Sequence, residues 1–349
     1  MMSIYSLCSV LSLSTMPSTQ ASARHTAGLQ IQVAESLSTL TSSVLSRHVS
    51  DSQTTTLPLG RTLGYAIYGS PAGRPLFYVH GYPSSRLEAY ALEPIALQHD
   101  ILVVAPDRPG YGLSSPCETR RIIDFPADVR ALADHLDIAR FAVLGVSGGG
   151  PYALACADEL PPGMLSAVGL LASARPWEAG RSNNTLWRRA FAMGTIHVPW
   201  LIRGVLDALV GLLKWASRQV QQQVDERKTG DAPTKAAKPR DQMSSPQQSR
   251  ARLLRMFFEA FTQGSGETVR EGRLLQHPLG INFSDVSYQK VQIWHGSEDK
   301  QSPIENIRWM AKQLPHSELK EFKENGHFSM GEKLEQILEE LMSDDRKRK

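Results

Sequence analysis

The feature that most constrains this chain is a Gly-x-Ser-x-Gly segment at residues 145–149. Six mostly apolar residues, 141–146, run directly into it, and small residues of helical character follow from Gly150. This order predicts a strand, a sharp turn and a helix, with glycines beside the serine because a Cβ there would collide with the neighbouring strand or helix. Ser147 would then stand exposed at the carboxyl edge of a sheet, as a nucleophile. The alternative is a glycine-rich turn with an incidental serine.

The composition of the 349-residue chain is that of an ordinary globular protein. Hydrophobic residues make up 41% and charged residues 21% of it, which suffices to bury a sizeable core. The formal charge is only +3, and basic residues are dispersed apart from a tail at 346–349, so no nucleic-acid partner is expected. The cysteines, Cys8, Cys117 and Cys156, are odd in number and lack metal-ligand spacing, which predicts neither a disulfide framework nor a metal site.

Serine and threonine dominate the N-terminal region. Residues 1–55 have few bulky apolar side chains in periodic positions, so we expect a disordered tail outside the fold. The first 34 residues contain no acidic side chain, as in a transit peptide, and the apolar run from Ile4 to Leu13 weakly resembles a signal peptide. We favour an untargeted tail and a cytoplasmic protein.

No segment reaches the roughly 20 uncharged apolar residues that a transmembrane helix needs. The most hydrophobic stretch, Trp200 to Trp215, contains Arg203, Asp207 and Lys214. It therefore predicts an amphipathic or buried helix, and we expect no transmembrane segment.

Strands and helices alternate over two parts of the chain, 56–175 and 287–343. Residues 57–61 and 62–68 predict two short strands joined by a turn at Gly60, which would form an antiparallel edge. Apolar runs predict further strands at 76–80, 101–105, 141–146, 165–172, 291–295 and 317–322, and helical patterns separate them at 86–97, 124–136, 150–160, 303–314 and 333–342. This alternation predicts an α/β fold with a mostly parallel, doubly wound sheet covered on both faces.

The alternation stops between these two parts, at residues 176–286. Helical segments rich in Trp, Leu and Met replace it, at 185–191, 200–220, 250–261 and 268–276. Within this insertion, residues 221–250 contain only Val224 and Met243 as large aliphatic side chains, which predicts a flexible loop. Residues 344–349 are expected to form a solvated basic tail.

Five segments along this pattern resemble the α/β-hydrolase fold family, in content and in order. They are the Gly-x-Ser-x-Gly turn at 145–149, called the elbow below, the His80-Gly81-Tyr82-Pro83 loop, the loop at 107–112, the acidic loop at 296–303 and the histidine at 327. The resemblance covers residues 56–343 and puts the helical insertion where this family has its cap domain. It implies an α/β-hydrolase fold with a serine nucleophile.

A serine hydroxyl needs a base, itself held by an acid, before it can attack a carbonyl carbon. In this family the partners follow in the order acid, then histidine, at the carboxyl ends of strands. His316 precedes the last predicted strand and would lie on the opposite edge from Ser147. His327 follows that strand and would lie on the same edge, so we expect it to be the catalytic base; the alternative is an exposed loop histidine.

Two carboxylates, Glu298 and Asp299, come just after the strand at 291–295. The spacing from Gly296 through Asp299 to Pro303 resembles the acid loop of the family, in which the aspartate four residues before the proline points at the histidine. We therefore expect Asp299 to be the catalytic acid and Glu298 to be a solvated neighbour. Asp107 precedes the serine, and we expect it to hold its own loop.

The resemblance also implies two backbone donors for the oxyanion of a tetrahedral intermediate. The residue after the nucleophile, Gly148, would supply one amide. The 80–83 loop resembles the oxyanion loop of the family, and Tyr82 would supply the other amide. For the His80 side chain we favour a structural role in that loop.

These residues lead to the expectation of a serine hydrolase that acts on a carboxylic ester or thioester of a moderately hydrophobic small molecule, without a cofactor. Carbon–carbon bond hydrolysis beside a ketone is the enzymatic alternative, and a small-molecule receptor that keeps the triad is an alternative of another class. The related epoxide hydrolases and dehalogenases use an aspartate nucleophile, so Ser147 argues against both. The insertion contains four tryptophans that are expected to line a pocket or to form plain core: Trp177, Trp187, Trp200 and Trp215. The sequence leaves the oligomeric state open.

Overall fold

The computed structural model describes residues 50–180, 186–230 and 246–346, which fold around one eight-stranded sheet. The strand order is β1-β2-β4-β3-β5-β6-β7-β8. Strand β2 pairs antiparallel with β1 and β4, whereas all other neighbours are parallel. The strand bounds are β1 Ser50–Thr56, β2 Thr62–Gly69, β3 Arg74–Val79, β4 Ile101–Pro106, β5 Phe141–Val146, β6 Leu165–Leu171, β7 Val291–Gly296 and β8 Ser317–Phe322.

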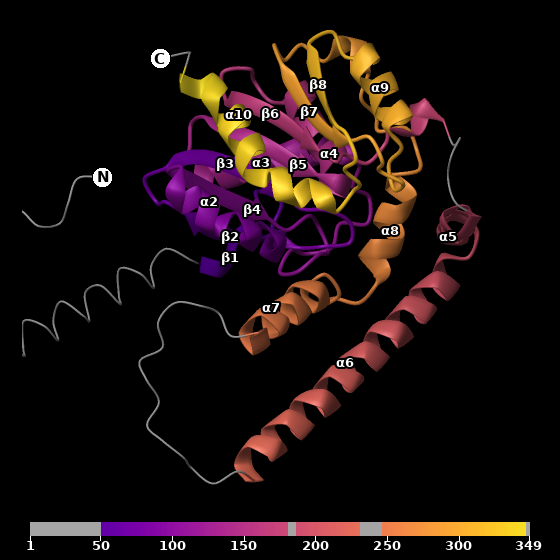
Figure 1. The fold of residues 1–349 in the computed structure, drawn as a ribbon. Helices are drawn as coiled ribbons and strands as arrows, with labels where there is room; N and C mark the ends of the chain where they lie inside the picture. The colour runs from indigo at the N-terminus through magenta and orange to yellow at the C-terminus, as the bar shows by residue number, and fades with distance from the viewer. Residues whose placement is uncertain (1–49, 181–185, 231–245, 347–349) are drawn as a thin grey trace, which may run out of the picture. The chain divides into compact units, whose positions relative to one another are not determined.

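Helices cover both faces of this sheet (Figure 1). Successive side chains of β5 alternate between two buried clusters: Phe141 and Val143 belong to one, Ala142 and Leu144 to the other. The first cluster contains side chains of α3, α4 and α9, and the second contains side chains of α2 and α10. The expected doubly wound α/β fold is therefore confirmed. The bounds are η2 Arg86–Leu92, α2 Glu93–Gln98, η3 Ile122–Asp124, α3 Phe125–His135, η4 Ser147–Gly149, α4 Gly150–Glu159, α9 Ile304–Gln313, η7 Ser329–Lys333 and α10 Leu334–Arg346.

The antiparallel edge begins earlier than the sequence pattern predicts. Residues 50–55, expected to belong to a disordered tail, form most of β1, and Thr56 pairs with Thr62 of β2. Residues 57–61 are the turn between the strands, closed by a bond of 2.8 Å from the Gly60 amide to the Leu57 carbonyl. The strand sequence Ser-Asp-Ser-Gln-Thr-Thr-Thr is polar because it lies at the sheet edge, where backbone pairing rather than apolar burial holds it.

The regular structure described in the insertion between β6 and β7 is helical, and turns and loops connect its helices. Its helices are η5 Trp177–Ala179, α5 Leu186–His197, α6 Pro199–Gly230, α7 Pro246–Glu259, α8 Gly266–Leu274 and η6 Phe283–Asp285. The expected loop at 221–250 is wrong at both ends, since α6 continues to Gly230 and α7 begins at Pro246; residues 231–245 lie outside the described residues. Low hydrophobicity was a poor guide at 221–230 because Gln, Glu, Lys and Arg are polar residues that favour helices.

The C-terminal helix is longer than the sequence pattern predicts. Helix α10 continues to Arg346, so residues 344–346 are helical rather than part of a tail.

Among the described helices, no single one is long and apolar enough to span a membrane. Helices α5 and α6 together pass a test of length and hydropathy, but they are bent by 116° relative to each other.

Buried charges attach α8 to the core. Glu271 of α8 is fully buried and lies 2.6 Å from the Arg108 guanidinium and 3.1 Å from that of Arg120. Both arginines come from the segment that follows β4, and both are almost fully buried. Because charges removed from water need compensation, this cluster ties the position of α8 to the core.

We expect Glu271→Gln to lower the free energy of unfolding by roughly 3–5 kcal/mol, because it leaves the buried Arg108 guanidinium without its carboxylate and Arg120 with only the longer contact of 3.5 Å to Glu267. Urea unfolding followed by circular dichroism measures this. The matched control is Glu318→Gln, which removes an exposed carboxylate paired with Lys290 at 2.8 Å and should cost less than about 1 kcal/mol. Equal losses for the two variants would contradict the anchoring role of Glu271.

Candidate active site

The turn after β5 puts Ser147 in a conformation that non-glycine residues rarely adopt. Its φ is 52°, and it begins the short helix η4. A Cβ on Gly145 would lie 2.4 Å from the Gly149 carbonyl oxygen, and a Cβ on Gly149 would lie 2.1 Å from the carbonyl oxygen of Val79. Only glycine allows the turn, the helix and β3 to approach so closely, because a Cβ would collide with neighbouring backbone, as the sequence predicted.

Ser147, His327 and Asp299 form a continuous chain of hydrogen bonds. Ser147 Oγ lies 2.9 Å from His327 Nε2, and His327 Nδ1 lies 2.7 Å from Asp299 Oδ2. The serine follows β5, the aspartate follows β7, and the histidine lies in the loop after β8. The parallel strands thus bring together three residues spread over 180 positions of the chain.

The structure separates Asp299 from its competitors. Asp299 is buried, whereas Glu298 beside it is exposed, and His316 precedes β8 and is also exposed. Asp107 accepts bonds from the backbone amides of Arg86 at 2.7 Å and Leu113 at 2.9 Å, as expected of a residue that holds its own loop.

The surroundings of Asp299 favour its charged form. Burial alone would raise the pKa of this carboxyl, but hydrogen bonds from His295 and His327 outweigh burial and hold the pKa below its ordinary value. The second oxygen, Oδ1, accepts the amides of Gln301 at 2.7 Å and Ser302 at 2.9 Å. An ionised Asp299 fixed in this way orients His327 with its Nε2 toward Ser147.

A second histidine, His295, was not expected at this site. It is the second-last residue of β7, is fully buried, and has Nε2 2.7 Å from the Ser302 carbonyl oxygen and 3.3 Å from Asp299 Oδ2. A carbonyl only accepts, so this Nε2 carries the proton that also faces Asp299. The only sequence signal for His295 was its place in Trp-His-Gly, close to the carboxyl end of a predicted strand. The apolar residues before it predicted the strand but gave no reason to assign the histidine a role.

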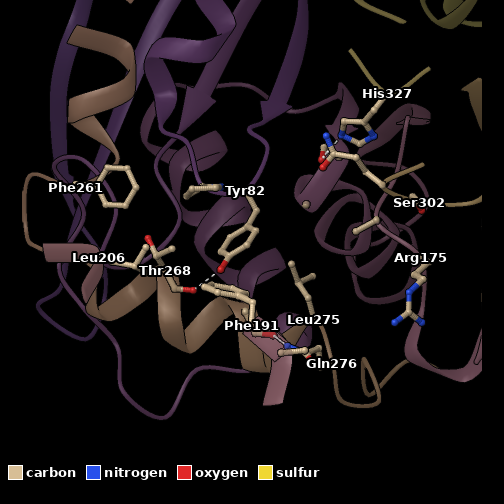
Figure 2. Close-up of a pocket in the computed structure, with 17 residues that line it drawn as sticks. Tyr82, Arg175, Phe191, Leu206, Phe261, Thr268, Leu275, Gln276, Ser302 and His327 are labelled. Carbon is tan, nitrogen blue, oxygen red and sulfur yellow. Dashed lines mark hydrogen bonds between the residues drawn. The ribbon is translucent and has the colours of Figure 1, made fainter. Parts of the chain in front are cut away.

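Tyr82 and Gly148 meet beside Ser147. A Cβ on Gly148 would lie 2.4 Å from Tyr82 Cβ and 3.1 Å from the Tyr82 amide nitrogen, so the backbones of the two residues lie against each other. The Tyr82 side chain crosses to the cap, where its hydroxyl donates to the Thr268 carbonyl of α8 at 2.6 Å (Figure 2). The predicted oxyanion loop therefore also contacts the insertion.

Buried polar side chains hold the loop of Tyr82. His80 is fully buried; its Nδ1 lies 2.9 Å from the Gly81 carbonyl, and its Nε2 accepts the Arg108 amide at 3.2 Å. Burial, reinforced by Arg108, pushes the pKa of His80 well below its ordinary value, so the ring is neutral and structural. The Arg108 guanidinium donates to the carbonyls of His80 and Gly81, and Glu88, which the sequence did not indicate, accepts the Gly81 amide at 3.1 Å.

A cavity of about 400 Å³ opens beside Ser147 and His327. Figure 2 shows Tyr82, Phe191 and Leu275 close to one another along it, with His327 at one end. The insertion supplies much of the wall: Phe191, Ala192, Leu206, Phe261, Thr268, Gly272, Leu275 and Gln276. Apolar side chains form the larger part of its walls, and polar groups come from Ser147 and His327 and from Arg175, Thr268, Gln276, Gln301 and Ser302.

The tryptophan side chains that the structure describes in the insertion do not line this cavity. Trp200 and Trp215 are 71% and 60% exposed, so the expectation of pocket wall or core is wrong for both. Trp177 is partly buried and stacks on His277 with ring centroids 6.1 Å apart. The side chain of Trp187 lies outside the described residues.

One cluster in the described part of the chain has a spacing that could hold a metal ion. It comprises His99, Glu335 and Glu339, whose candidate ligand atoms all lie within 4.8 Å of one another. Both carboxylates are exposed and already pair with the histidine. None of the three residues lines the cavity at Ser147.

Comparison with known proteins agrees with this architecture. Residues 74–334 match the family model described as the alpha/beta hydrolase fold. Because the match spans most of the chain and includes the elbow, the acid loop and the final histidine, the protein belongs to the α/β-hydrolase fold family.

The named relatives share shorter segments with this chain. It is 37% identical over 34% of its length to the dihydrolipoyllysine-residue acetyltransferase component of an acetoin cleaving system from Pseudomonas putida, and 36% identical over 33% of its length to a serine hydrolase-like protein from Danio rerio. The matched segments cover only 32% and 35% of those two proteins. Among solved structures, an esterase from Exiguobacterium antarcticum has a TM-score of 0.58 at 19% identity, with 84% of this chain and 99% of that chain covered.

We expect Asp299→Asn to slow the reaction of Ser147 with a fluorophosphonate probe by about 10⁴-fold, because an amide neither holds the reactive tautomer of His327 nor stabilises its cation. The rate of probe incorporation, measured by intact-protein mass spectrometry, tests this. Glu298→Gln is the matched control and should leave that rate unchanged. The reverse ranking would show that Glu298, not Asp299, is the acid.

Proposed function

We propose that this protein is a serine hydrolase that cleaves the carboxylic ester or thioester of a moderately hydrophobic small molecule. The observation that carries the proposal is the hydrogen-bond chain from Ser147 through His327 to Asp299 at the wall of a 400 Å³ cavity. Membership of the α/β-hydrolase fold family and the hydrolase-like relative from Danio rerio support the same class of activity.

In the first half of this reaction Ser147 is acylated. His327 Nε2, 2.9 Å from Ser147 Oγ, removes the hydroxyl proton while the oxygen attacks the carbonyl carbon. The Tyr82 and Gly148 amides donate to the oxyanion that forms. The tetrahedral intermediate then collapses, and His327 returns the proton to the departing alcohol or thiol.

In the second half, water releases the acid. His327 takes a proton from a water molecule, the resulting hydroxide attacks the acyl carbon, and the same donors stabilise the second oxyanion. The bond to Ser147 Oγ breaks as His327 returns the proton to it. Asp299 keeps its charge throughout and stabilises the imidazolium that forms twice in each cycle.

The cavity supports a small substrate. Its volume lies near the lower end of the range of about 300–1,000 Å³ that is typical of ligand pockets. Phe191, Leu206 and Leu275 offer apolar contact to an acyl or alkyl group, whereas Gln276 and Arg175 offer polar contact further along the wall. We therefore expect short acyl esters to be better substrates than long-chain ones.

The test is turnover of a graded series of p-nitrophenyl esters by the wild type and by Ser147→Ala. We expect multiple turnovers by the wild type, fastest with short acyl chains, and a loss of about 10⁴-fold or more in Ser147→Ala, which keeps the fold but lacks the nucleophilic oxygen. Ser217→Ala, on α6 and outside the cavity, is the matched control. Ordinary activity in Ser147→Ala would refute the mechanism. Stoichiometric capture without turnover would favour a receptor, and turnover of a ketone substrate alone would favour carbon–carbon bond hydrolysis.

A further inference from the structure

Helix α6 exposes many large apolar side chains to solvent, which is unusual for a helix that packs only on its own protein. On the inner side, Val210 is buried against Tyr111 and Phe261, and Leu206 reaches the cavity. On the other side lies a stripe of large apolar residues that are between 41% and 60% exposed. This stripe is called the outer face of α6: Leu201, Val205, Leu209, Leu212, Leu213 and Trp215.

The spacing of these residues makes one continuous surface. Leu201, Val205 and Leu209 follow one another at four-residue intervals, and Leu212 continues the row three residues later. Trp200, at the start of the helix, is 71% exposed. The polar contacts of α6 lie elsewhere: Asp207 accepts the Ser265 amide at 2.7 Å, and Lys214 lies over the Phe258 ring. A contiguous row of large apolar side chains left in solvent is typical of an interaction surface.

The chemistry of the helix selects a lipid surface as that partner. Tryptophan prefers the boundary between the headgroups and the hydrocarbon of a bilayer, and this helix exposes two. Between residues 199 and 222 the charged side chains are Arg203, Lys214 and Arg218 against one acid, Asp207. An apolar stripe with a basic excess is the pattern of helices that lie flat on anionic membranes.

The same charges disfavour the other occupants. The N-terminal segment of the chain has no acidic residue before Glu35, so it offers little charge complement. A span across the bilayer is disfavoured too, because no single described helix passes the length and hydropathy test for one.

We propose that the outer face of α6 binds the surface of an anionic phospholipid bilayer, with the helix axis parallel to the membrane plane. Binding itself does not depend on the proposed ester hydrolysis. If that function holds, docking also has a consequence for the site: Leu206, on the opposite side of the same helix, lines the cavity, so an apolar substrate dissolved in the membrane would be released close to the cavity wall.

The test is flotation of the full-length chain with vesicles of phosphatidylcholine, with and without phosphatidylglycerol. We expect tighter binding to the anionic vesicles, weakening with salt, together with a blue shift of tryptophan emission. The triple variant Val205→Glu, Leu209→Glu, Leu212→Glu should bind at least about a hundredfold more weakly, because each large aliphatic side chain kept in water forfeits about tenfold in affinity. A second triple variant, with serine at the same three positions, should also bind more weakly. Because serine adds no negative charge, this variant tests the loss of apolar surface alone.

Leu59→Glu is the matched control, since Leu59 is 92% exposed in the turn after β1 and should leave binding unchanged. Hydrolysis of a soluble p-nitrophenyl ester should be the same in all variants, which checks folding and separates this proposal from the catalytic one. Wild-type protein that does not float, or triple variants that float like the wild type, would overturn the proposal. So would equal binding to both vesicle types, or a wild-type dimer that the triple variants convert to monomer without lipid.

Discussion

The close packing of the elbow on its neighbours determines the rest of the site. Gly149 touches the carbonyl end of β3, and Gly145 touches Gly149 and Ala153 of the segment that follows the turn, so Ser147 is held close to the strand that leads into the 80–83 loop. Tyr82 then meets Gly148 without any further adjustment of the chain. The strained φ of 52° at Ser147 is maintained because sheet and helix enclose the turn on both sides.

Charge burial connects this elbow region to the cap. Arg108 donates to the carbonyls of His80 and Gly81 with its guanidinium and pairs with Glu271 of α8, so one side chain positions both the 80–83 loop and a helix of the insertion. The Tyr82 hydroxyl makes a second connection to α8. Helix α6, by contrast, contacts the remainder through few residues and exposes a long apolar face. The cap therefore has an anchored part close to the chemistry and an outer part available to a partner.

The sequence predicted the parallel core well because apolar runs, glycine turns and helical periods agree there. It also predicted which residues meet, since chain order and the polarity of parallel strands select Asp299 and His327 over Glu298 and His316. It failed where polar residues form regular structure: the edge strand at 50–56 and the helical continuation to Gly230 have no apolar signal. Glu271 and His295 were missed because only tertiary packing brings a lone carboxylate or a strand histidine to the site.

The most direct test of the account is to capture the covalent intermediate. A slowly deacylating ester should be mixed with the protein and quenched in acid within the first turnover, and the digest examined by mass spectrometry. We predict that the acyl mass appears on the peptide carrying Ser147, at close to one equivalent, and disappears as product accumulates. Product formation without any adduct, or an adduct on another residue, would contradict the central claim that Ser147 is the nucleophile of this protein.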